Sequence, residues 1–142
     1  MRETLEKLRP DHWAWLHAKV AFIIWATLIL IYTPVRVADV LGFVLVIAMC
    51  SVIILGMLIS IFGLFGSLSN KASVARQGVR LELFGLWLSM GGPFAYMATQ
   101  IYILTQPNPG DRSAQVVLAY LIMAFLLIRI VIILSHRKRA QG

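Results

Sequence analysis

The sequence predicts an all-α integral membrane protein, a four-helix bundle with its N- and C-termini in the cytoplasm. Hydrophobic residues make up 60% of the 142 positions and charged residues 13%, which leaves too few polar side chains to cover a soluble core. The apolar residues fall into four long runs, and the basic residues concentrate on alternate segments between and beyond these runs. Together these observations predict the fold class and the orientation.

Each run is long enough to cross a bilayer as a helix. About 20 residues at about 1.5 Å per residue span a hydrocarbon core of about 30 Å. The predicted spans are 13–32, 41–65, 79–104 and 114–134. The runs are continuous, whereas barrel strands alternate apolar and polar residues, and a helix satisfies its own backbone groups in lipid. We therefore expect residues 1–142 to form a single four-span transmembrane domain.

The distribution of Lys and Arg predicts the orientation. The N-terminal tail, the connection 66–78 and the C-terminal tail hold most of them, whereas the other two connections hold only Arg36 and Arg112, each near an aspartate. The positive-inside rule places both tails and the middle connection in the cytoplasm, so we expect a multi-pass protein of the inner (cytoplasmic) membrane. The net charge of +7 is spread over short segments, which favours the lipid bilayer as partner and argues against nucleic acid.

Small and polar residues recur at steps of four and three along the third span, which keeps them on one helix face. A shorter series follows the second span. Small residues let helices approach closely in lipid, so we expect both seams to face protein, either each other or a second subunit. A seam that lines a pore or drives self-assembly is the alternative. The predicted seam residues are Gly56, Ser60, Gly63, Ser67, Gly78, Gly85, Ser89 and Gly92.

The middle of the third span contains Gly91, Gly92 and Pro93. Proline removes a backbone donor and clashes one turn back, and adjacent glycines soften the same place. We predict a kink here. It is either a structural kink or a break in the helix of the kind that marks ion and substrate sites at membrane depth.

Two charged residues lie inside predicted spans on the cytoplasmic side, Glu82 in the third and Arg129 in the fourth. Charges within a membrane pair, face water or extend to the headgroups. One hypothesis is a Glu82–Arg129 ion pair that fixes the third helix against the fourth. The alternative is that Arg129 reaches the cytoplasmic headgroups and Glu82 pairs with Arg80 or Arg76. Lys19 is expected to extend back towards the N-terminal tail.

The sequence offers little catalytic chemistry. Cys50 is expected to be a small apolar filler, and His12, His17 and His136 have no metal-ligand spacing with Cys, Asp or Glu. Neither a phosphate-binding glycine loop nor a nucleophile elbow is present. We expect a protein that is not an enzyme and that holds no cofactor or metal.

The chain ends in a basic tail, Ser135-His136-Arg137-Lys138-Arg139-Ala140-Gln141-Gly142. In this tail, its small size, its seams and the expected lack of a soluble domain, it resembles phage holins, particularly multi-span membrane proteins encoded by phages of actinobacteria. The resemblance covers the whole chain and rests on architecture, so it transfers no residue role. It implies accumulation in the inner membrane, lateral assembly into a homo-oligomer and timed opening for a lysis enzyme.

Two other functions remain open. Four spans in a chain of this length also resemble the small multidrug-resistance transporters, but that family relies on a carboxylate in its first helix and residues 13–33 contain no Asp or Glu. Alternatively, the protein is a non-catalytic accessory or scaffold subunit whose seams bind a larger membrane partner.

Overall fold

The computed structural model describes residues 10–32, 42–106 and 113–139, and the side chains of 116–135 within the last range. Four helices fill these ranges: α2 (Pro10–Ile31), α4 (Phe43–Ser67), α5 (Ala72–Leu104) and α6 (Ser113–Arg139). The described ranges contain no strand. The prediction of an all-α chain with four long helices is confirmed.

The largest difference from the predicted boundaries is at the start of α5. This helix begins at Ala72 rather than near Val79, so the connection after α4 is only 68–71. The run from Ala72 to Gly78 is polar but contains no proline, and nothing in it opposes helix formation. Polarity there predicts where an apolar span begins, not where the helix begins. At the start of α4, Gly42 precedes the helix with φ of 77°, a conformation that suits glycine.

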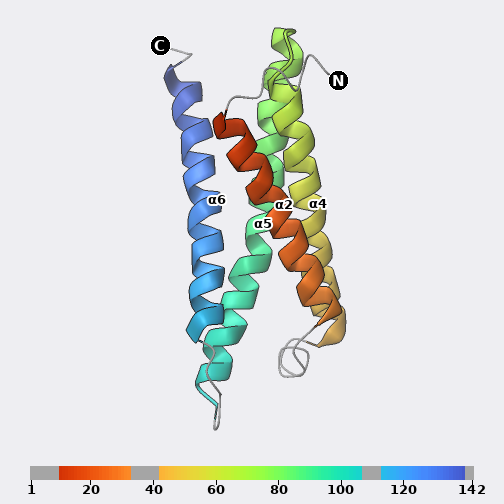
Figure 1. Cartoon of the computed structure of the whole chain (residues 1–142), viewed down its shortest axis with the longest axis vertical. Helices are drawn as coiled ribbons and strands as arrows, with labels where there is room; N and C mark the ends of the chain where they lie inside the picture. Colours follow the sequence, from red (N-terminus) through yellow and green to blue (C-terminus); the bar gives the residue numbers. More distant parts are fainter. Residues whose placement is uncertain (1–9, 33–41, 107–112, 140–142) are drawn as a thin grey trace.

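The helices run alternately up and down (Figure 1). The start of α2, the end of α6 and the connection between α4 and α5 lie at one end of the bundle, and α2 crosses in front of α4 and α5. Helix α5 has α4 on one side and α6 on the other, and α2 packs on α4. The side chains of Lys71, Arg76 and Arg80 are exposed, and they belong to the end of the bundle where α4 connects to α5.

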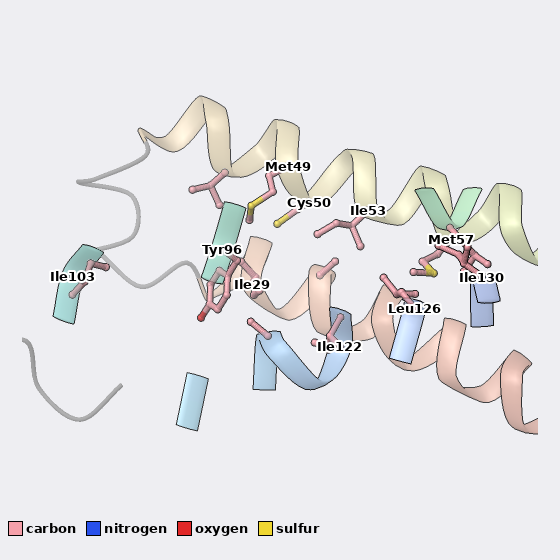
Figure 2. Packing of buried hydrophobic residues seen from close by; sticks show 14 of the residues in the cluster. Ile29, Met49, Cys50, Ile53, Met57, Tyr96, Ile103, Ile122, Leu126 and Ile130 are labelled. Atoms are coloured by element: carbon pink, nitrogen blue, oxygen red, sulfur yellow. The ribbon is translucent and has the colours of Figure 1, made fainter. Parts of the chain in front are cut away.

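The core is a continuous apolar cluster to which all four helices contribute. Figure 2 shows Met49, Cys50 and Ile53 of α4 along the side of that helix that faces α2. Tyr96 of α5 packs edge-to-face on Trp25 of α2, with ring centroids 5.5 Å apart. Large apolar side chains also cover the outside of the bundle, where they would be costly in water over so wide an area.

Three helices are long and apolar enough to cross a membrane: Pro10–Ile31, Phe43–Ser67 and Val116–Ser135 within α6. Helix α5 is not among them, and it contains both a seam of small and polar residues and a polar first part. The polar residues of that seam are buried against other helices. The prediction of four apolar segments is thus supported for three by composition, and α5 combines a buried polar seam with an exposed polar start.

Of the two forms considered for the kink predicted at Gly91, Gly92 and Pro93, the break in the helix is absent, since α5 stays helical from Ala72 to Leu104 with Pro93 inside it. Pro93 and Gly92 are buried, whereas Gly91 is exposed and a Cβ added there would meet no atom within 4 Å. These residues therefore do not form a discontinuous helix with free backbone groups.

Candidate functional site

The two seams face each other within one chain. A Cβ added at Gly63 would lie 2.7 Å from the carbonyl oxygen of Gly78, and one added at Gly56 would lie 2.8 Å from that of Gly85. Side chains of any size at these positions would push the helices apart. Of the two alternatives left open by the sequence, the structure shows intramolecular packing of α4 against α5.

The other seam residues complete this contact. Ser89 donates a hydrogen bond to the carbonyl of Gly85 at 2.8 Å and a longer one across the interface to that of Ile53 at 3.4 Å. Gly78 packs against Gly66 and Ser67, and Gly92 packs against Ile53. The close approach of the two backbones fixes the rotation of α5 and thereby the direction in which Glu82 points.

Glu82 lies at the centre of a buried charge cluster formed with Lys19 and Arg129. The Oε1 atom of Glu82 accepts a hydrogen bond of 2.6 Å from Lys19 Nζ. The same oxygen accepts bonds of 3.0 Å from Nε and 2.8 Å from Nη2 of Arg129. One carboxylate oxygen thus joins α2, α5 and α6.

The fourth helix enters the cluster through its backbone. Lys19 Nζ donates a second hydrogen bond, 3.2 Å long, to the carbonyl oxygen of Ser60 in α4. Ser60 is a seam residue, and a Cβ added to Gly85 on α5 would lie 2.9 Å from its Cα. Helix packing and the charge cluster are therefore parts of one arrangement.

Trp15 covers the face of the Arg129 guanidinium. The Cζ atom of Arg129 lies 4.9 Å from the centroid of the Trp15 ring, a cation–π distance. The same ring contacts Phe125 of α6 with centroids 4.5 Å apart. The side chains of Lys19, Glu82 and Arg129 are 2%, 2% and 9% exposed, so protein encloses the first two and covers most of the third.

The cluster contains two cations and one carboxylate. With the usual charges it carries a net charge of +1 inside the bundle. A buried ion pair repays its desolvation only when its geometry is good, and short charge-assisted bonds such as these supply that geometry. The additional cation remains without a second anion among the described side chains of the cluster.

The predicted Glu82–Arg129 pair is present, with the nitrogen and oxygen atoms 2.8 Å apart. Neither Arg80 nor Arg76 pairs with Glu82 among the described contacts, and both side chains are exposed. The expectation for Lys19 is wrong, because this side chain does not extend to the N-terminal tail but turns inward to Glu82. There the carboxylate 2.6 Å away satisfies the charge of the ammonium group.

The depth of Lys19 in its predicted span already indicated that this residue could reach Glu82. Lys19, Glu82 and Arg129 each lie about one to two turns inside the cytoplasmic end of a predicted span, so antiparallel packing places them at one level. Depth alone, however, does not fix which face of each helix is turned inward. That information comes from the packing of the seams.

Other candidate residues form no site in the described part of the chain. Cys50 is buried in the apolar core, and the described residues contain no group of His, Cys, Asp and Glu able to hold a metal ion. His17 bonds to the backbone oxygen of Trp13 at 2.8 Å. Several basic residues lie outside the part of the chain that the structure describes. They are Arg2, Lys7 and Arg9 of the N-terminal tail, Arg36 and Arg112 of the two other connections, and the side chains of 136–142.

The site therefore consists of a buried Lys–Glu–Arg cluster held by two glycine-rich helix faces. No protein family, no curated protein and no solved structure matches the chain.

Proposed function

We propose that the chain is a four-span protein of the inner membrane with both termini in the cytoplasm. Three helices have the length and hydropathy of spans, and α5, about 50 Å long at its 33 residues, packs between α4 and α6. Lys71, Arg76 and Arg80 lie at the end that the positive-inside rule assigns to the cytoplasm. Tyr32 and Tyr102 are exposed near the other ends of their helices, where aromatic rings favour the interface.

Within that membrane, we propose that the protein self-assembles and permeabilises the bilayer in the manner of a holin. The observation that carries this proposal is the separation of polar from apolar groups. Lys19, Ser60, Glu82, Gln100 and Arg129 are buried inside the bundle. The outside is covered by apolar side chains suited to lipid.

This inside-out distribution fits a protein that is inert as a closed bundle and conducts after rearrangement. When helices separate or exchange partners between subunits, the polar interior becomes available to line water, whereas the apolar exterior still faces lipid. Since the glycine seams already pair within one chain, the subunits of an assembly meet through their outer faces or after the α4–α5 contact has opened.

Inducible expression in bacteria with a potential-sensitive dye tests the proposal. Cells that accumulate the wild-type protein are expected to lose membrane potential abruptly, and crosslinking of the same membranes is expected to give oligomers. The matched control is Gly91→Ala, at an exposed position where a Cβ meets no atom within 4 Å. Full membrane potential in cells whose membranes contain the wild-type protein would refute permeabilisation.

A small ion or solute transporter is the second candidate, and the charge cluster is the observation that favours it. Ionisable groups inside a membrane often mark ion and proton pathways. This function predicts resistance to organic cations that disappears in Glu82→Gln, with the membrane potential retained. Neither effect, together with co-purification of a larger membrane protein, would instead support an accessory subunit.

A further inference from the structure

We propose that Arg129 binds the phosphate of an anionic phospholipid of the cytoplasmic leaflet on the edge of its guanidinium that Glu82 leaves open. The inference rests on the membrane placement proposed above but not on the permeabilising activity. Its basis is the geometry of the guanidinium, the charge of the cluster and the level of the cluster in the bundle.

The guanidinium of Arg129 is only partly used by the protein. Its Nε and Nη2 atoms, which form one edge of the planar group, both donate to Glu82 Oε1. Trp15 covers one face. In the described part of the chain no hydrogen bond involves Nη1, so the end edge made by Nη1 and Nη2 retains donors directed away from Glu82. Paired donors of this kind match the oxygens of a phosphate.

The charge of the cluster favours an anion at that edge. Lys19 and Arg129 share a single carboxylate, and the resulting net charge of +1 lies among apolar side chains. An uncompensated charge in such surroundings is costly. A phosphate carrying one negative charge makes the group neutral, and at Nη1 it leaves the bonds from Nε and Nη2 to Glu82 in place.

Under the membrane placement proposed above, the cluster lies about one to two turns inside the cytoplasmic ends of the spans, a depth that a long arginine side chain bridges to the lipid phosphates. Arg80 is exposed on α5 and is only two residues, about 3 Å along the axis, from Glu82. An exposed arginine places the boundary between headgroups and hydrocarbon near its own level. Trp13 is 40% exposed and lies six residues, about 9 Å along α2, on the cytoplasmic side of Lys19, as expected for a residue at the interface.

Native mass spectrometry of the purified protein with phosphatidylglycerol or phosphatidylcholine tests the inference. We expect the wild-type protein to retain phosphatidylglycerol in preference to phosphatidylcholine, since only the former adds a net negative charge. Arg129→Lys keeps the charge opposite Glu82 but loses the planar second edge, and retention is expected to fall by about tenfold. Inorganic phosphate in excess should compete poorly, because it lacks the lipid chains that hold the group at this level.

Two further variants separate binding from structural damage. Lys19→Met lowers the net charge of the cluster to zero and is expected to weaken retention. Glu82→Gln raises it to +2 and, in protein whose circular dichroism matches that of the wild type, is expected to strengthen retention despite the lower stability. Damage to the fold would lower retention in both. Arg80→Gln is the matched control, an exposed arginine outside the cluster, and should change retention less than twofold.

Equal retention of the two lipids, or an equal loss in Arg80→Gln and Arg129→Lys, would overturn the inference and assign binding to the basic end of the bundle as a whole. Selective retention by a protein that does not depolarise cells would instead refute the permeabilising activity and leave the lipid site in place.

Discussion

Removing the one carboxylate of the charge cluster should destabilise the protein more than removing either cation. In Glu82→Gln the amide oxygen still accepts hydrogen bonds, but the negative charge behind the three bonds of 2.6, 2.8 and 3.0 Å is gone and the two cations remain buried without an anion. Breaking a buried pair in this way costs about 3–5 kcal/mol. Lys19→Met and Arg129→Met each leave a neutral ion pair behind.

The expected loss for Lys19→Met is no more than about 2 kcal/mol. The variant gives up the bonds to Glu82 and to the backbone oxygen of Ser60, but methionine fills the space of the apolar stem, and the excess charge disappears. The Ser60 carbonyl lies inside α4 and keeps its helical partner. The unequal cost of removing the carboxylate and either cation follows from the composition of two cations and one anion.

Equilibrium unfolding in mixed micelles of dodecylmaltoside and sodium dodecyl sulfate, followed by far-ultraviolet circular dichroism, measures these differences. Arg80→Gln is the control for removal of an exposed charge and should lie within about 0.5 kcal/mol of the wild type. If Lys19→Met costs as much as Glu82→Gln, or if Glu82→Gln costs less than about 1 kcal/mol, then Glu82 is not the centre of the cluster and the reasoning fails.

Three other predictions concern packing and orientation. Gly85→Ala should lower the free energy of unfolding by about 1–3 kcal/mol, because its Cβ would lie 2.9 Å from the Ser60 Cα, and an unchanged unfolding curve would contradict the packing of α4 on α5. Gly91→Ala, in open space on the same helix, should be neutral or stabilising by up to about 1 kcal/mol in the same assay. In a Cys50→Ser background, a cysteine at Ser69 should react with a membrane-impermeant maleimide only after the cells are opened, whereas labelling in intact cells would reverse the orientation.

The positions of the long helices and of the two seams could be predicted because they depend on local features of the chain. Apolar run length determines which segments enter lipid, and a spacing of four and three places Gly56, Gly63, Gly78 and Gly85 on one face of each helix. The start of α5 at Ala72 could not be predicted from hydropathy, which marks only where the apolar span begins near Val79, because nothing in the preceding polar residues stops helix formation.

The charge cluster could be predicted only in part. Glu82 and Arg129 stood out as charges in apolar runs at similar depth, and the structure places them 2.8 Å apart. Lys19 has the same signal, but a lysine near the end of a span has two ways to satisfy its charge, by reaching the headgroups or by turning to a buried anion. The choice depends on the distance to Glu82, which is a property of the packed bundle.

By itself, then, the sequence determined that this chain forms long helices with one small, polar face on each of the two central ones, because hydropathy and helical periodicity act over neighbouring residues. Only the tertiary structure decided that these faces meet within one chain and that Lys19 and Arg129 share a single carboxylate oxygen. Those contacts join residues up to 63 positions apart in the chain, and their energies depend on distances that exist only after α2, α4, α5 and α6 have packed.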